Sequence, residues 1–546
     1  IEMIPYLQPI AGIHLHSNLM AELEPNSDIS YIYIFTAVAL FILIIACINF
    51  MNLSTARASK RSREVGMRKV SGATREQLMR QFLFESLVIS FFCLVIAFVI
   101  VEALLPVFGN LTGIDLDPYF HQPITFVIMI LLGLFVGIFS GAYPSFILSA
   151  FQPIRAMKGA LYQGMKKSIL RNLLVLLQFT ISIVMLVSTW FIYKQMEYVK
   201  YKKLGFDQEN LVIIPLKSER IKEQGAMLKN EFEQLGSVKS ISLTASVPGE
   251  GLSGKGFSPE GVDSKSPWIL FMVICDHNFI DVFNMKIKEG RQLSRDYGTD
   301  SMAMVINEAL VRKLGWEDPI GKKIYDFGQG DSIQRYYTVV GVVEDFHYQS
   351  LHDAIEPSVI MLNRRDPDFL AIRLNPGDPA EGIRQLQEKW EEVETAFPFE
   401  YFFMKEEYED QYRSEQKMAE LFITFTILAI FIACLGLFGL VLFSISQRTK
   451  EIGIRKILGA SVSGIMYRLS VEFGRWILIA SVIAWPVSYL VVDRWLESFV
   501  YRIEIFDYSW IFIVSALIAL VIAQVTISYH AYRAAMKNPV DAVKWE

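Results

Sequence analysis

The chain is poor in cysteine, and its few cysteines are not arranged for disulfide or metal chemistry. Of the four, Cys47, Cys93 and Cys434 lie inside long apolar runs and Cys275 stands alone. Disulfide frameworks and cysteine-based metal sites both need cysteines at matched spacings. Neither is present, and we expect no metal ion in this protein.

A complete nucleotide-binding loop is also missing. The stretch 249–256 contains Lys255 and meets most of the Walker A pattern. However, Gly256 occupies the position of the Ser or Thr that would bind Mg²⁺. No other stretch offers such a loop. We therefore predict that the chain is not an enzyme, binds no cofactor, and depends on a partner for any ATP hydrolysis.

One polar cluster invites a catalytic or metal-binding interpretation. Asp345, His347 and His352 lie close together with Ser350 and Asp353. They follow a predicted strand, where a turn with satisfied polar groups is the simpler reading. We therefore predict no catalytic role for this cluster.

Ionisable residues are absent from the middle of the long apolar runs. Glu85, Glu102, Glu472, Arg475 and Asp493 all lie towards the ends of these runs. An ion-coupled carrier would normally place charge near the middle of the bilayer. A hydrophilic pore is equally unsupported. The pattern favours spans that transmit motion over spans that conduct a solute.

What the chain does have is apolar sequence in long blocks. Hydrophobic residues make up 52% of the 546 positions, and seven runs reach about 20 residues, enough to cross a bilayer. The predicted spans are approximately 31–53, 83–105, 124–146, 169–193, 420–446, 474–496 and 508–529.

The distribution of Lys and Arg orients these spans. Segments 54–82, 155–171 and 447–473 are rich in both residues, so we place them inside. Loop 106–123 has neither Lys nor Arg and falls outside. The sides alternate without conflict, which puts the long insert 194–419 outside as well.

A basic segment that lies between two spans occurs twice in the chain. Arg61–Thr74 returns as Arg448–Ser461, an offset of 387 residues (448 − 61). A solvated basic loop would explain the charge but not the matched acidic residues and glycines. We therefore predict that both copies dock a soluble partner. The predicted docking residues are Arg61, Glu64, Gly66, Arg68, Lys69 and Gly72, with Arg448, Glu451, Gly453, Arg455, Lys456 and Gly459 in the second copy.

Local signals predict a short surface helix for the first copy. Gly72 suits a helix C-cap, and Thr74 with Gln77 forms a capping box that begins the helix entering the second span. The second copy keeps Ser461 but has Gly464 where the box needs Glu or Gln.

The repeat also covers the neighbouring spans. Spans 1–3 match spans 5–7, so we predict an α-helical transmembrane protein with two parallel repeats and an α+β extracytoplasmic domain. The predicted domains are 1–30 (the end of a truncated periplasmic domain), 31–160 (first three-helix unit), 161–193 (a helix leading out), 194–419 (the insert) and 420–546 (second three-helix unit).

The insert mixes strand and helix patterns and reads as two small lobes. Helical patterns fall near 218–235, 307–315 and 379–395. Its flanks, about 190–204 and 405–420, either extend spans 4 and 5 as a stalk or are ordinary linkers. We favour the stalk. Strand-like runs are 210–215, 239–244, 268–275, 303–306, 336–343, 358–362, 369–374 and 400–403.

These motifs resemble those of a known family. The stretches Glu64–Ala73 and Glu451–Ala460 are similar to the signature of FtsX/MacB-type ABC transporter permeases, and the insert resembles their MacB-like periplasmic core domain. The matching stretches of the insert are 204–207, 290–293, 306–308, 314–321 and 341–347, and 142–144 with 538–539 also fit.

The resemblance implies a permease subunit in the bacterial cytoplasmic membrane, surrounded by lipid, with its large domain in the periplasm. A separate ATPase dimer of the MacB or LolD kind would bind the two basic segments and drive the periplasmic domain through the stalk. A periplasmic adaptor or an outer-membrane channel would be a further partner, and nucleic acid would not. The family's first span and first outer domain are missing, so we expect an N-terminally truncated chain.

Two functions remain open at this point. The first is export of a lipoprotein, a peptide or a drug. The second is a sensor or regulatory complex that signals, or controls a cell-wall enzyme, without transporting cargo. The docking segments would be the same in both.

Overall fold

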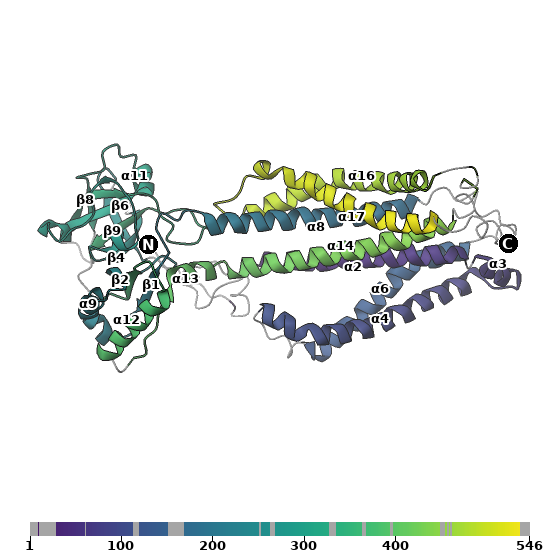
Figure 1. Ribbon diagram of the computed structural model, residues 1–546, viewed down its shortest axis with the longest axis horizontal. Helices are drawn as coiled ribbons and strands as arrows, with labels where there is room; N and C mark the ends of the chain where they lie inside the picture. Colours follow the sequence, from purple (N-terminus) through teal and green to yellow (C-terminus); the bar gives the residue numbers. More distant parts are fainter. Residues whose placement is uncertain are drawn as a thin grey trace.

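The computed structural model describes residues 9, 29–60, 62–112, 120–150, 169–249, 253–262, 268–326, 335–362, 367–393, 397–447, 454–455, 458 and 461–535. Nearly all of the predicted N-terminal segment 1–30 lies outside these residues. The molecule is elongated: a sheet domain occupies one end, and long helices run from it to the other end (Figure 1).

Seven helices of the described chain are long and apolar enough to cross a membrane, which confirms the predicted number of spans. They extend past the predicted runs because charged residues at their ends continue the helix. They are α2 (Ile29–Lys60), α4 (Arg75–Thr112), α6 (Pro123–Ala150), α8 (Ile169–Tyr201), α14 (Arg413–Gln447), α16 (Val462–Leu496) and α17 (Trp510–Ala535).

The helices form two groups joined along α2 and α14. Helices α8, α14, α16 and α17 share an apolar core that includes Phe191 and Ile477. Helices α4 and α6 pack together on the other side and reach α2 through α6. Between the groups, α2, α8 and α14 bury Ile45 and Ala429 in a core of their own. Figure 1 shows α2 and α14 side by side along the axis of the molecule.

The extracytoplasmic insert is built on a single sheet of eleven strands. The strands are β1 (Leu211–Pro215), β2 (Val238–Thr244), β3 (Ser253–Pro259), β4 (Trp268–Cys275), β5 (Ile287–Gly290), β6 (Ala303–Asn307), β7 (Lys323–Asp326), β8 (Arg335–Val343), β9 (Ser358–Leu362), β10 (Phe369–Leu374) and β11 (Phe402–Phe403).

The first lobe is an antiparallel layer in the order β11-β1-β10-β2. Helices α9 (Glu219–Glu233) and α12 (Pro379–Val393) contribute Phe232 and Trp390 to its core. Ser218 caps α9 by accepting a hydrogen bond from the Ile221 N–H. This lobe therefore buries the apolar face of two amphipathic helices against a sheet.

The second lobe closes on itself. Its pairings run β4-β3-β7-β8-β6-β9, and β9 returns parallel to β4. The core of this ring holds Phe257, and helix α11 (Glu308–Leu314) adds Leu310. The lobes are joined where β2 meets β4 at Thr244 and Cys275. The two predicted lobes are thus parts of one continuous sheet.

Three strands and two short helices of the insert were not predicted. Strand β3 overlaps the stretch that resembles a Walker A loop, and its glycines weaken the alternating pattern typical of a strand. β5 and β7 have only four residues each, too few to show alternation. Helix α10 (Phe279–Val282) and the 3-10 helix η2 (Gly298–Met302) are equally short.

The two flanks of the insert differ. Helix α8 runs without a break into the base of the sheet domain, where Val199 joins its core. The other flank is interrupted: α13 (Met404–Asp410) ends, and α14 begins at Arg413. Buried Tyr412 lies at this break, and its hydroxyl accepts a hydrogen bond from the Leu351 N–H of the domain.

Candidate functional site

The first basic segment forms helix α3 (Ser62–Val70), at the end of the molecule opposite the sheet domain (Figure 1). Its C-terminus is a complete Schellman motif. The Gly72 N–H donates to Lys69 O at 3.1 Å, and the Ala73 N–H donates to Arg68 O at 2.9 Å. Gly72 has φ +95°, a conformation that favours glycine. The predicted helix and its glycine cap are therefore present.

The predicted capping box is present as well. The Gln77 N–H donates to Thr74 Oγ1 at 3.3 Å, and the Thr74 N–H donates to Gln77 Oε1 at 3.0 Å. In the second copy the Gly464 N–H donates to Ser461 Oγ at 3.1 Å, and no side chain can return the bond. Helices α4 and α16 thus begin at equivalent positions, one with a full box and one with half.

Helix α3 is held firmly on the two helices that follow it. Val65 is buried against Leu78 and Phe82 of α4. The Lys69 ammonium donates to the carbonyl of Ser149, near the end of α6, at 2.7 Å. The Arg68 guanidinium donates to Gln81 of α4 and to Glu64 of α3, both at 2.7 Å. The predicted basic residues therefore fix the position of α3, and any partner meets a helix that is already rigid.

Two apolar residues are exposed on α3 beside the charged Glu64 and Arg68, which we did not predict. The side chains of Met67 and Val70 are 59% and 62% exposed. Exposed apolar side chains on a fixed helix suit insertion into a partner's pocket. The signal was present in the sequence, because Met67 matches Ile454 in the second copy and both are apolar within a basic segment.

Only part of the second copy can be compared. Of its predicted docking residues, Arg455 is described, whereas Arg448, Glu451, Gly453, Lys456 and Gly459 lie outside the described residues, as does Arg61 in the first copy. Ile454 and Leu458 are 53% and 79% exposed. The second copy therefore also presents apolar side chains.

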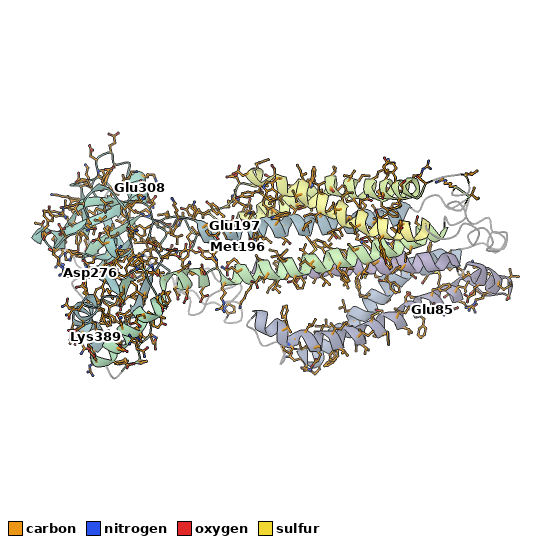
Figure 2. The ribbon with its side chains drawn as sticks, viewed as in Figure 1. Glu85, Met196, Glu197, Asp276, Glu308 and Lys389 are labelled. Atoms are coloured by element: carbon orange, nitrogen blue, oxygen red, sulfur yellow. The ribbon has the colours of Figure 1, made fainter. Side chains whose placement is uncertain are left out.

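At the opposite end, the sheet domain is fastened to the helices at several points. Buried Gln195 of α8 holds the outer loop between α16 and α17: its Nε2 donates to Tyr501 O, and its Oε1 accepts from the Ile503 N–H, each at 3.0 Å. Met196 packs against the core of the sheet domain and also against the core between α2, α8 and α14. Figure 2 shows Met196 and its neighbour Glu197 on α8 at this junction.

The histidine and aspartate cluster belongs to the same junction. His352 faces Glu415 of α14 and Ser498 of the outer loop. His347 is buried in edge-to-face contact with Tyr501 at 4.6 Å, and burial lowers its pKa to about 4. Asp345 accepts from the Ala309 N–H at 2.7 Å and pairs with Arg312.

The three side chains of this cluster thus point to different partners. Among the described residues, no group of three His, Cys, Asp or Glu side chains is placed to hold a metal ion. The part of the Walker-like stretch that the structure describes lies largely in strand β3, where Lys255 pairs with Asp326 at 2.7 Å. Lys255 therefore forms an ion pair between two strands of the sheet.

Comparison with known families agrees with this architecture. The family model described as the FtsX-like permease C-terminal matches residues 36–153 and again residues 423–539. The model of the MacB-like periplasmic core domain matches residues 174–389. Together the two models cover most of the chain. The chain belongs to the FtsX-like permease family. It is an ABC-type permease of the cytoplasmic membrane, and its sheet domain is a periplasmic MacB-like core domain.

Individual relatives of this FtsX-like permease are distant. The macrolide export ATP-binding/permease protein MacB of Campylobacter jejuni is 30% identical over 121 residues, which is 22% of this chain and 18% of that protein. The probable syringafactin export ATP-binding/permease protein SyfD of Pseudomonas syringae is 23% identical over 185 residues, 32% of this chain and 27% of that protein. The match therefore spans about a fifth to a quarter of each relative.

Similarity to solved structures is low. The periplasmic region of MacB from Actinobacillus actinomycetemcomitans is 13% identical and covers 39% of this chain and 97% of that one. Its TM-score is 0.29, so the assignment of this FtsX-like permease rests on the family models instead.

Proposed function

We propose that this FtsX-like permease is the membrane subunit of an ABC exporter, in which a separate cytoplasmic ATP-binding subunit drives motion of the periplasmic domain. The observation that carries the proposal is the unbroken helix α8. It begins at Ile169, crosses the predicted membrane region and contributes Val199 to the core of the sheet domain. A continuous helix buried at its outer end can transmit a displacement along its whole length.

The cytoplasmic end supports a site for mechanical input. Helix α3 is fixed to α4 by Val65 and to α6 by Lys69. A force applied to α3 therefore reaches both spans. Exposed Met67 and Val70 provide an apolar contact for a partner. Because Ile454 occupies the matching position in the second copy, one chain offers two such contacts, enough for the two subunits of an ATPase dimer.

The periplasmic end supports a site for output. Gln195 joins α8 to the outer loop of the second permease unit, and Trp495 of α16 packs against the core of the sheet domain as well as both membrane cores nearby. Movement of α8, α14 or α16 would therefore be passed to the sheet domain. The contacts favour motion of the domain as a body.

The packing of α8, α14 and α17 supports the handling of cargo outside these spans. The cavity between α8, α14 and α17, lined by Ser182, Cys434 and Ile522 among others, has a volume of about 20 Å³. That is room for about one water molecule. We propose that cargo of the kind named for the relatives, a macrolide or a syringafactin, is handled on the periplasmic side.

Affinity purification of the full chain from its own membranes tests the proposal. Mass spectrometry should recover an ATP-binding cassette protein at a ratio of two per permease chain. Its ATP hydrolysis should rise when cargo is added, and export from cells should stop when the permease is deleted. Recovery of the chain without any ATP-binding protein would refute the proposal. A stable complex whose loss leaves export unchanged would favour the sensor instead.

A further inference from the structure

Helices α2 and α14 meet at positions that the predicted repeat makes equivalent. Phe35 and Phe422 are 387 residues apart, the same offset as the two basic segments, and their rings contact at 5.7 Å. The two matches of the permease model also begin 387 residues apart, at 36 and 423. In a two-fold interface each residue at the axis meets its own equivalent. The α2–α14 contact has this form within a single chain.

At another equivalent pair further along the contact, the two helices differ in a complementary way. Asn49 of α2 corresponds to Gly436 of α14, again at the offset of 387. The Asn49 Nδ2 atom donates to Ile432 O of α14 at 2.5 Å. A Cβ atom added to Gly436 would lie only 1.7 Å from Asn49 Oδ1. The asparagine therefore occupies the space that glycine leaves, and no side chain fits at position 436.

The same difference recurs one turn further along. Asn52 of α2 corresponds to Gly439 of α14, and a Cβ atom at position 439 would lie 2.2 Å from the side chain of Leu53. Both asparagines are at least nine-tenths buried. Within the described chain, Asn49 Oδ1 and Asn52 Nδ2 have no hydrogen-bond partner. Buried polar atoms of this kind cost stability, and their best-attested use is to specify which helices pair.

Contact between two copies of the same helix would be less favourable than contact between α2 and α14. Two copies of α2 would place Asn49 against Asn49, where a side chain meets no empty space. Two copies of α14 would place glycine against glycine, with no side chain at this position to bond across the contact to Ile432 O. Helix pairing in membranes depends on small residues that allow close approach and on hydrogen bonds across the contact. Only the pairing of α2 with α14 provides both.

We propose that Asn49 and Gly436 are a pairing determinant within the membrane, which makes the second permease unit of a chain the partner of its first unit and rejects the α2 helix of a second chain. The proposal depends on the contacts of α2 and α14 and not on the ATPase or the cargo. It therefore stands or falls separately from the proposed function.

An exchange of the two residues tests the proposal in the full-length chain. The four native cysteines are replaced by alanine, and Phe35→Cys with Phe422→Cys reports the α2–α14 contact as an intrachain disulfide formed by mild oxidation in detergent. Asn49→Gly should reduce the yield because the bond to Ile432 O is lost. Gly436→Asn should reduce it further, because two asparagines collide. Combining both changes moves the asparagine to the other helix and should restore the yield and the melting temperature towards those of the parent.

A matched control separates the effect of a steric clash with Asn49 from the effect of placing a polar side chain in the membrane. Leu435→Asn places the same side chain one residue earlier on α14, on an exposed face, and should keep the disulfide. In a chain carrying Phe35→Cys alone, disulfide-linked dimers should be absent. The proposal is overturned if Gly436→Asn forms the intrachain disulfide as well as the parent. It is also overturned if the exchanged chain is no better than the single variants, or if the Phe35→Cys chain readily forms dimers.

Discussion

The Nε2 atom of His352 lies 3.5 Å from Oε1 of Glu415, and this contact joins the base of the periplasmic domain to the first turn of α14. The other ring nitrogen, Nδ1, lies 3.0 Å from the carbonyl oxygen of Ser498 in the outer loop. An imidazole with an acceptor at each nitrogen is best satisfied when protonated, because only the charged ring donates from both. One side chain therefore links three segments that any movement of the domain must affect.

This linkage predicts a pH-dependent stability. Burial disfavours the charged ring, but the hydrogen bonds to Glu415 and Ser498 O outweigh it, so the pKa of His352 is raised from its ordinary value. A raised folded-state pKa stabilises the protein below the ordinary pKa, and this is lost as pH rises through the raised value. We expect the melting temperature in detergent to be highest below the ordinary histidine pKa of about 6.5 and to fall as the pH rises above it.

Two histidine variants check the source of that change. His352→Gln should melt lower at the acidic end and lose this part of the pH dependence. His347→Gln is the contrast, because burial lowers the pKa of His347 to about 4 and the unfolded chain binds that proton first. Removing this ring takes away a contribution of opposite sign, so the fall in melting temperature with rising pH should become steeper. An unchanged pH profile in His352→Gln would show that the contact with Glu415 does not titrate in this range.

The exposed apolar positions predict where an ATP-binding subunit attaches. Met67→Glu should weaken co-purification of that subunit, because a charge replaces an apolar contact that is 59% exposed in the free permease. Buried contacts of this size typically contribute about 2 kcal/mol, or roughly thirtyfold in affinity. Ile454→Glu should have a similar effect at the second copy. Both variants should leave melting unchanged, since neither side chain is buried.

Charge reversal at the predicted basic residue gives a contrast. Arg68→Glu should lower stability as well as binding, because Arg68 bonds to Gln81 and Glu64 within the permease. Met67→Leu, which keeps an apolar side chain, should bind normally. If Arg68→Glu abolishes binding at full stability while Met67→Glu binds normally, the basic residues contact the ATPase directly.

The outer loop predicts a stability effect at Gln195. In Gln195→Ala the Tyr501 carbonyl and the Ile503 N–H lose their partner. A buried backbone group left unsatisfied costs about 1–3 kcal/mol. We expect a lower melting temperature and faster hydrogen exchange of the loop amides around Ile503. Gln387→Ala, at an exposed position of α12, is the control and should change neither.

A proline at Gln416, whose N–H makes a backbone hydrogen bond at the start of α14, should separate hydrolysis from output. The Gln416 N–H donates to Tyr412 O at 2.9 Å. Gln416→Pro removes this bond and places its ring against the same carbonyl, at a cost of about 3 kcal/mol. ATP hydrolysis should persist while export falls. Gln416→Ala should be mild, whereas Glu415 cannot serve as a silent control because it is buried against His352. Normal export in the proline variant would show that this turn carries no force.

Several parts of the architecture could be predicted because their signals are local. Runs of about 20 apolar residues identify a span wherever they occur, and the cap formed by Gly72 needs only neighbours on the chain. The periodicity of α9 and α12 was equally clear. By contrast, β5 and β7 are too short for a pattern, and β3 contains two glycines that weaken one.

The roles of individual site residues depended on contacts between distant segments. Arg68 and Lys69 look alike as basic residues in a loop, yet Lys69 is directed to Ser149 and Arg68 to Gln81. The break at Tyr412 could not be predicted either. Helix propensity favours continuation there, but the Tyr412 hydroxyl accepts from the Leu351 N–H, 61 residues away.

The sequence by itself determined the seven spans, their orientation and the two copies of the basic segment, because hydrophobic length, charge bias and capping act over a few residues. Tertiary structure alone decided which surfaces are free and which are occupied. The fit of Asn49 into the space left by Gly436, and the link from His352 to Glu415, exist only once helices far apart in the chain are packed together. No local pattern records such pairs, because the partner of each residue is chosen by packing.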